Sequence, residues 1–125
     1  MNTSIEKVIK EFYSWFQNNK YEEKCMCCLS ENFLDNKNVL YIDNIHVNVE
    51  HRRKNIATSI MNKLIELSDD NELFIYLEIS EYSEINSDVL RNFYSLYDFE
   101  PSELVGDYGE IFFRKYKNFI PEFSI

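Results

Sequence analysis

The order of the apolar segments after residue 38 is the feature that most limits what this chain can fold into. Segments with a strand-like apolar pattern alternate with segments whose apolar residues recur at helical spacing. The predicted order is strand, helix, strand, helix, strand, strand, over residues 39–49, 55–68, 73–79, 86–97, 99–105 and 110–116. This alternation predicts an α/β (α+β) fold in which helices pack on a mixed sheet.

The first 38 residues predict one helix and one short strand. Residues 4–18 carry apolar side chains at helical spacing, and Thr3 with Glu6 forms a capping-box start. The short apolar stretch 25–29 predicts a strand. Because the chain has 125 residues, 45% of them apolar, and no repeat or Pro/Gly linker, we expect a single domain over residues 1–125.

Three cysteines stand close together, at Cys25, Cys27 and Cys28. An odd number at such short spacing is a poor disulfide framework. A metal site would need further ligands, and the two histidines, His46 and His51, lie in a segment with a different expected role. We therefore expect buried reduced thiols and no metal, with metal or redox chemistry as the alternative.

The net charge of −9 is unevenly distributed. Residues 1–60 hold eight acids and eight bases, whereas residues 61–125 hold fourteen acids and five bases. An acidic surface repels phosphate backbones and attracts amines and basic proteins, so we expect no nucleic-acid partner. Solubility alone also explains such a surface. No apolar run nears the roughly 20 residues of a membrane span and no signal peptide is recognised, so we expect a cytoplasmic protein with no membrane partner.

The segment 45–57 carries the clearest chemical signal. Three cations, Arg52, Arg53 and Lys54, stand between a predicted strand and a predicted helix. Cations there add to the partial positive charge of the helix N-terminus, which is unfavourable unless an anion binds. With an anion present, free backbone N–H groups and nearby cations form a phosphate site. A solvated basic turn before an ordinary helix is the alternative interpretation.

Two residues of this turn support the phosphate interpretation. Ala57 is the only alanine in the chain, and it stands where the first helical turn would come closest to a ligand. A larger side chain there would push phosphates away from the amides. Asn55 stands where left-handed backbone geometry is expected, and Asn is the non-glycine residue that tolerates it best.

The stretch resembles motif A of the GNAT superfamily of N-acetyltransferases. That motif reads Arg/Gln-x-x-Gly-x-Gly/Ala after a strand, and Arg52, Asn55 and Ala57 occupy its defined places. The upstream residues 45–47 match the family's strand, whose backbone pairs with the pantetheine arm of the cofactor. Arg53 and Asn55 replace two glycines that are common in the motif. This difference from the motif affects the expected backbone geometry of the turn but not its location.

A second match lies downstream, where residues 86–99 resemble motif B, Asn-x-x-Ala-x-x-Phe-Tyr-x-x-x-Gly-Phe. The residues in register are Phe93, Tyr94 and Phe99. Asp98 replaces the glycine, and Asn86 lies one place out of register. Residues 77–79 resemble the family's Leu-Glu/His-Val strand.

The two motifs together span about residues 41–116, in the order that the family shows. The first 38 residues are too short for the two helices and three strands that commonly precede motif A, so the resemblance implies a pared-down member. Its build is similar to that of very short phage-encoded members, including an anti-CRISPR acetyltransferase that modifies a lysine on its target nuclease.

The resemblance implies a mixed, mostly antiparallel sheet flanked by helices. It also implies transfer of an acetyl group from acetyl-CoA to a primary amine by direct attack in a ternary complex. No covalent enzyme intermediate is implied, so the cysteines need no nucleophilic role. The residues implied to bind acetyl-CoA are Ile45, His46, Val47, Arg52, Arg53, Lys54, Asn55, Ile56, Ala57, Asn86 and Tyr94.

Three side chains are the main candidates for catalysis. By its match to motif B, Tyr94 is the expected general acid, since a phenol with a pKa of about 10 stays protonated and can donate to the leaving sulfur. Glu78 interrupts an apolar strand, where a carboxylate is either catalytic or paired. Asp43 stands where family members often place an acid, and His46 is a lesser candidate for the base. A core tyrosine and structurally bound or solvated carboxylates are the alternatives.

The acceptor and the activity itself stay open. The acids Glu81, Glu84 and Asp88 follow Glu78 and predict an entrance for an amine such as a lysine side chain, an N-terminus, a polyamine or an aminoglycoside. The charge disfavours aminoacyl-tRNA, and a homodimer is left open. Two alternatives remain: a catalytically inactive GNAT-fold module that binds CoA or a protein, and a small α/β interaction protein with no CoA site.

Overall fold

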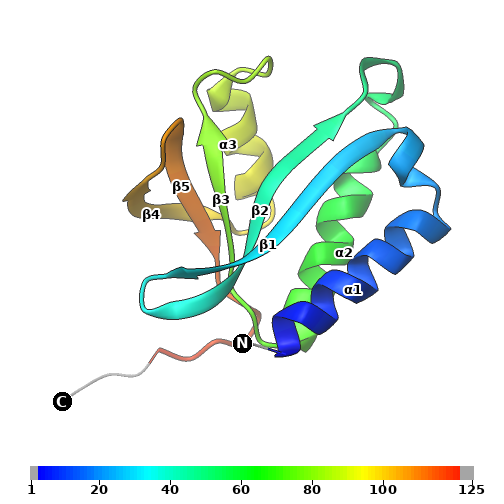
Figure 1. The fold of residues 1–125 in the computed structure, drawn as a ribbon. Helices are drawn as coiled ribbons and strands as arrows, with labels where there is room; N and C mark the ends of the chain where they lie inside the picture. The colour runs from blue at the N-terminus through cyan, green and yellow to red at the C-terminus, as the bar shows by residue number, and fades with distance from the viewer. Residues whose placement is uncertain (1–2, 122–125) are drawn as a thin grey trace.

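A five-stranded sheet and three helices make up the computed structural model, which describes residues 3–121 (Figure 1). The helices are α1 (Thr3–Asn18), α2 (Ile56–Asp70) and α3 (Ser87–Ser95), with short 3₁₀ turns η1 (Tyr21–Glu23) and η2 (Val49–His51). The strands are β1 (Cys25–Leu34), β2 (Lys37–Val47), β3 (Ile75–Ser80), β4 (Glu100–Val105) and β5 (Gly109–Arg114). The sheet order is β1-β2-β3-β5-β4, and of these pairs β2–β3 is parallel. The predicted fold class and the order of elements after residue 38 are confirmed.

β1 and β2 form a long hairpin around the two-residue turn Asp35-Asn36. Both turn residues have positive φ, 52° and 64°, as a type I′ turn requires. The strand expected at 25–29 is therefore present but continues to residue 34. The cysteines on it are only partly as expected, because Cys28 is exposed while the other two are buried.

The pairing of β1 with β2 is interrupted between Cys28 and Leu29, and Asp43 is the residue on β2 that is left without a partner. A bulge of this kind inserts one residue and reverses the face to which later side chains point. On β2, Ile42 packs in the helix-covered core before the bulge, and the odd-numbered Val47 packs there after it. The bulge thus changes which side chains of residues 44–47 face the helix-covered core.

β2 and β3 are neighbours for three residue pairs, 40–42 with 75–77. Beyond these, β2 stays paired with β1, while β3 pairs with β5 as far as Ser80 opposite Gly109. The two parallel strands therefore separate toward their C-terminal ends, as Figure 1 shows. In sheets with parallel strands, ligands commonly bind outside such ends.

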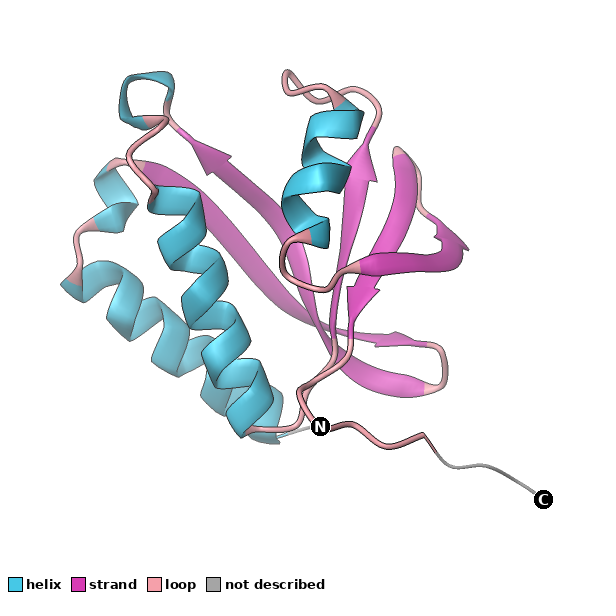
Figure 2. Cartoon of the chain, turned by 180° about the vertical axis from the view of Figure 1, so that it is seen from behind, coloured by secondary structure: helices cyan, strands magenta, loops and turns pink. Residues whose placement is uncertain are grey.

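The three helices cover one face of the sheet, which Figure 2 shows from the helix side. The core between them contains fully buried side chains of α1, α2, β2 and β3, among them Val8, Phe12, Ile60, Leu64, Leu40 and Ile75. Helix α3 has no buried residue of its own. Its residues Leu90, Phe93 and Tyr94 pack against this core from outside, and α3 lies against β3, the middle strand of the sheet.

The opposite face carries a smaller cluster of Val39, Phe74, Tyr76 and Ile111, against which Tyr116 and Phe119 of the C-terminal segment pack. On the helix-covered face, Arg114 at the end of β5 joins the sheet to α2 and to the segment after α3. Its guanidinium donates to both carboxylate oxygens of Asp69 at 2.8 and 3.2 Å and to the carbonyl of Tyr97 at 3.0 Å. These contacts fix the end of α2 against β5.

Several predicted boundaries differ from the observed ones by one or two residues, and two of these differences have a clear local cause. The strand expected at 39–49 ends at Val47, because the chain turns at Asn48, whose N–H donates to the carbonyl of Lys24 at 2.9 Å. The helix expected at 86–97 ends at Ser95, shortly before Asp98 takes a positive φ of 69°. Within the described residues, no helix combines the length and the apolar content that crossing a bilayer requires.

Candidate functional site

The separation of β2 from β3 opens a pocket of about 900 Å³, within the size range of small-molecule sites. Its walls come from the end of β2, the turn before α2, the end of β3, the loop after β3, and α3. Of the predicted site residues, those that line it are Asp43, Ile45, His46, Val47, Arg52, Arg53, Asn55, Ile56, Ala57, Glu78 and Tyr94. Residues of both sheet faces are among them, so the pocket passes through the sheet.

The turn before α2 has the backbone geometry of an anion site. Arg53 and Asn55 both have left-handed backbone conformations, with φ of 64° and 61°. These are positions at which the family's motif favours glycine, so the substitutions retain the glycine-like turn. Asn55 precedes the first helical residue and its side chain makes no capping hydrogen bond. The first N–H groups of α2 therefore keep no helical acceptor and lie at the positive end of the helix dipole.

The three cations of this turn differ in their contacts. Arg52 is held within the protein, because its Nε donates to the carbonyl of Val47 at 3.0 Å and its guanidinium lies 3.6 Å from Glu84. Arg53 and Lys54 have no ion pair within the described residues. Arg53 lines the pocket and Lys54 does not. The turn thus offers one uncompensated cation directly at the pocket.

Glu78 is a paired carboxylate that nevertheless lines the pocket. Its Oε2 accepts a hydrogen bond of 2.6 Å from the backbone N–H of Tyr108 in the β4–β5 turn. Oε1 lies over Gly106, which has no side chain to obstruct it. The carboxylate is thereby held in one orientation at the point where β3 leaves β2.

Asp43 occupies the bulge on the neighbouring strand, where it is exposed and lines the pocket. The negative charges of both carboxylates affect the pKa of the half-buried Tyr41. Burial raises the pKa of the Tyr41 hydroxyl, and the negative charges of Glu78 and Asp43 raise it further. Glu78 and Asp43 therefore both lie near Tyr41, which is on the sheet face without helices.

Tyr94 faces the pocket from α3. Burial raises the pKa of its hydroxyl to about 12, with a smaller contribution from Cys27. Within residues 3–121, no hydrogen-bond partner of this hydroxyl is found. A protonated phenol without a partner among the described residues is a donor for a group that enters the pocket.

Two predicted cofactor contacts, Asn86 and Lys54, are not among the residues that line the pocket. The Asn86 side chain accepts a hydrogen bond from the N–H of Asp88 at 2.8 Å and so caps α3. Lys54 is not among the residues that line the pocket, whereas His46 lines it and is exposed. The roles predicted for Asn86 and Lys54 receive no support from this geometry.

Sequence reasoning missed several residues of the loop after β3. Tyr82, Ser83 and Ile85 line the pocket. Arg91 of α3 holds this region through Glu81 at 2.9 Å and Glu110 at 3.1 Å. The signal was present in the sequence, since an exposed loop rich in carboxylates and followed by a single arginine favours such a network.

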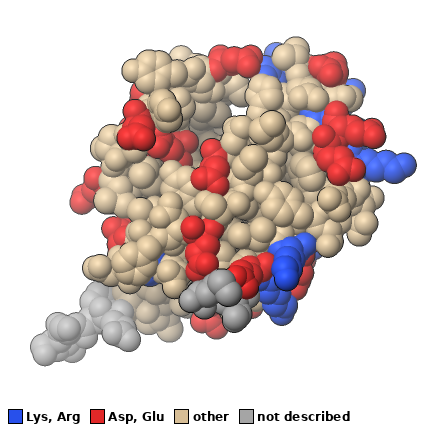
Figure 3. Space-filling model, viewed as in Figure 1, with Lys and Arg blue, Asp and Glu red and all other residues tan. Residues whose placement is uncertain are grey.

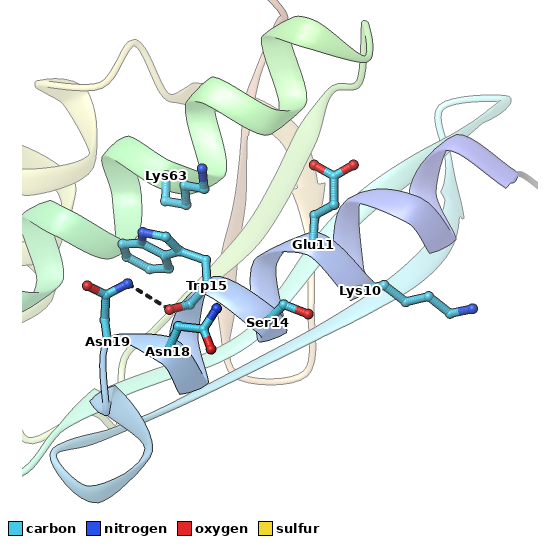
Figure 4. A pocket seen from close by; sticks show the side chains of 7 residues that line it. All are labelled: Lys10, Glu11, Ser14, Trp15, Asn18, Asn19 and Lys63. Atoms are coloured by element: carbon cyan, nitrogen blue, oxygen red, sulfur yellow. Dashed lines mark hydrogen bonds between the residues drawn. The ribbon is translucent and has the colours of Figure 1, made fainter.

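A separate hollow of about 510 Å³ lies between α1 and α2. Figure 4 shows Lys63 of α2 beside the indole of Trp15, whose carbonyl accepts a hydrogen bond of 2.8 Å from Asn19. The hollow contains none of the predicted site residues. We therefore place the functional site in the opening between β2 and β3.

Comparisons with known proteins agree with this fold. The model of the acetyltransferase (GNAT) family matches residues 4–106. The solved structure of Arabidopsis thaliana Naa50 in complex with the bisubstrate analogue CoA-Ac-MVNAL is similar, with a TM-score of 0.58, 16% identity, and coverage of 74% of this chain and 66% of that chain. This chain thus spans just under two thirds of the Naa50 length.

A second solved structure is similar over almost its whole length. It is an acetyltransferase of the GNAT family from Staphylococcus aureus Mu50, with a TM-score of 0.51, 16% identity, and coverage of 94% of this chain and 96% of that chain. At such identities the likeness concerns the fold. Among curated proteins, no sequence matches the chain.

Proposed function

This chain belongs to the GNAT family of acetyltransferases, and from that membership we propose that it transfers an acetyl group from acetyl-CoA to a primary amine. The observation that carries the proposal is the pocket between β2 and β3, because it joins an anion-binding turn to two carboxylates and a protonated phenol. The Naa50 structure contains a CoA-peptide analogue, which supports a CoA site in the same fold.

In this proposal the helix-covered side of the pocket holds acetyl-CoA. The amides at the start of α2 and the side chain of Arg53 bind the diphosphate, since both offer positive charge that no described residue compensates. Among the described residues, the segment 45–47 has no paired strand on the β3 side. The carbonyl of Val47 accepts from Arg52, and the other backbone groups on that edge are available to the pantetheine amides. Ala57 leaves room for the phosphates near the first helical turn.

The acceptor enters from the face without helices and attacks the thioester directly. The nitrogen lone pair forms a bond to the carbonyl carbon, and the carbon–sulfur bond breaks. Tyr94 donates a proton to the departing thiolate, and a carboxylate accepts the proton that the amine loses, directly or through water. The products are an N-acetyl amine and CoA thiol.

Glu78 is the base that the geometry favours over Asp43. The hydrogen bond from the Tyr108 N–H holds Glu78 at the opening, and a fixed base is more effective than a mobile one. Asp43 is exposed on the bulge and has no such contact among the described residues. Asp43 remains the second candidate, because it reaches the same region of the sheet.

We further propose that the protein works in the cytoplasm and that its acceptor is a lysine side chain, an N-terminal amine or a polyamine. The excess of acids around the acceptor side supports a positively charged acceptor. A phosphate-rich acceptor such as aminoacyl-tRNA is disfavoured for the same reason.

Two measurements test the function and separate it from an inactive CoA-binding module. Acetyl-CoA at a hundred times its dissociation constant should stabilise the protein by about 2.7 kcal/mol in a thermal-shift titration. Release of CoA thiol in the presence of lysine peptides or spermidine should then exceed the rate without acceptor. Binding without thiol release would support the inactive module, and no binding would exclude a CoA site.

A further inference from the structure

Two large aromatic side chains are exposed side by side where the loop after β3 meets the β4–β5 turn, and one of them, Tyr82, lines the pocket. Tyr82 lies in the loop after β3 and Tyr108 in the turn between β4 and β5, with 82% and 60% of their surface exposed. Their ring centroids are 6.4 Å apart and the ring planes are perpendicular. Core packing does not explain the pair, because neither residue belongs to a core cluster.

The backbone around both rings is held in place. The N–H of Tyr108 donates to Glu78 at 2.6 Å, and its carbonyl accepts from the N–H of Glu81 at 3.0 Å. The N–H of Tyr82 donates to the hydroxyl of Ser80 at 3.0 Å. Since tyrosine has only two side-chain torsions, a pair fixed in this way can bind a ligand with little loss of conformational freedom.

The surroundings of the pair are strongly acidic. Residues 76–90 contain four carboxylates and residues 98–112 contain five, and neither segment contains Lys or Arg. Figure 3 shows acidic side chains on the side of the molecule where β4 and β5 lie. Arg91 neutralises part of this charge through Glu81 and Glu110. Aromatic rings beside carboxylates attract cations, because the ring face carries partial negative charge.

We propose that Tyr82 and Tyr108 form a specificity subsite that binds the alkylammonium group of the acceptor beside Glu78. The inference rests on the proposed function, and it adds the recognition element that selects the acceptor. A primary ammonium on a flexible alkyl chain fits, since its charge contacts the ring faces and carboxylates while its methylenes cover the exposed rings. A lysine side chain and a free polyamine share this chemistry.

The experiment measures acceptor binding separately from catalysis. Isothermal titration calorimetry in the presence of CoA gives the dissociation constants of a lysine-containing peptide, its Nε-acetylated form and spermidine. Variants Y82A and Y108A should weaken binding of the cationic peptide or of spermidine by about fivefold to tenfold each. Y82F and Y108F should bind like the parent, because the rings and not the hydroxyls carry the interaction. Whichever cation loses affinity identifies the source.

Phe33 supplies a matched control, because it is 63% exposed on the β1–β2 hairpin, outside the residues that line the pocket. F33A should leave all three dissociation constants unchanged. The inference is overturned if the parent binds the cations no better than the acetylated peptide, or if Y82A and Y108A bind like the parent. If acetyl-CoA does not stabilise the parent protein, the proposed function is contradicted. The same calorimetric titrations, repeated without CoA, would then still test whether the tyrosine pair binds the cations.

Discussion

A methyl group on Gly106 would lie 1.8 Å from Oε1 of Glu78. The carboxylate therefore occupies space that any other residue at position 106 would fill. Its second oxygen is fixed by the N–H of Tyr108 in the same turn. The β4–β5 turn thus determines where the carboxylate of β3 points, and the position of the proposed base depends on a residue 28 places away in the sequence.

Gly106→Ala should displace the Glu78 carboxylate without unfolding the protein, because the obstructing atoms are the end of a flexible side chain. If Glu78 is the base, kcat should fall by at least about tenfold while the dissociation constant of acetyl-CoA stays within twofold. Thiol-release kinetics and a thermal-shift titration measure the two quantities. A folded variant with the kcat of the parent would move the role of base to Asp43.

Gly109 provides the contrast for that variant. A methyl group there would lie 2.0 Å from the backbone carbonyl oxygen of Ile79, which cannot move aside as a side chain can. Gly109→Ala should therefore lower the unfolding midpoint, whereas Gly106→Ala should not.

Tyr94→Phe should remove the proposed general acid. Because burial raises the pKa of Tyr94 to about 12, the phenol stays protonated at any practical assay pH. The parent kcat should therefore not decline through loss of this proton up to about pH 10. The variant should lose about a hundredfold in kcat with acetyl-CoA binding retained. Tyr97→Phe, on the same segment, should keep full activity, and a Tyr94→Phe enzyme as fast as the parent would reject the assignment.

The sequence indicated the order of elements, because that order depends on local patterns. Most residues predicted for the site line one pocket, and their roles stay predictions. Arg53, Asn55 and Asp98 have left-handed backbone conformations at positions where the GNAT motifs have glycine. For Asn55, the residue type alone had predicted this conformation. The bulge at Asp43 was missed, although two polar residues between Ile42 and Ile45 break the two-residue period and were a usable signal.

Other features depend on contacts between distant segments, which a single sequence does not encode locally. The tip of the first hairpin, residues 30–38, contains only Phe33 and Leu34 as apolar residues, so no apolar period marks the strands there. The pairing of Glu78 with the β4–β5 turn joins residues 30 places apart. The exposed tyrosines of the acceptor side appeared in the sequence as ordinary loop residues.

Asn55 should tolerate glycine better than alanine, because its φ of 61° disfavours a β-carbon. Asn55→Ala should lower the free energy of unfolding by about 1 kcal/mol, whereas Asn55→Gly should stay within about 0.5 kcal/mol of the parent. Urea denaturation measures both. Asn62→Ala, on the exposed side of α2, should cost nothing, and equal losses for both Asn55 variants would contradict the account of the turn.

Asp69 should stabilise the fold in a pH-dependent way. Burial alone would raise the pKa of its carboxyl, but hydrogen bonds from Arg114 and from the N–H of Lys117 lower it below the usual value. The lowered pKa adds stability above about pH 4, and this stability is lost as the pH falls through the folded-state pKa.

Asp69→Asn should therefore cost about 3 kcal/mol at pH 7, because it leaves the buried guanidinium of Arg114 without its counter-charge. The loss should shrink as the pH falls below 4. Denaturation at several pH values measures this dependence. The exposed neighbour Asp70 provides the control, since Asp70→Asn should change little, and an equal loss for both variants would contradict the role of the ion pair.

The central claim is that the turn before α2 binds the diphosphate of acetyl-CoA in the opening between β2 and β3. Titration of the ¹⁵N-labelled protein with acetyl-CoA, followed by two-dimensional NMR, tests it most directly. The account predicts that the backbone amides of residues 53–58 shift most, together with those of residues 45–47. If acetyl-CoA leaves these amides unchanged, or shifts only residues outside this pocket, the account is contradicted.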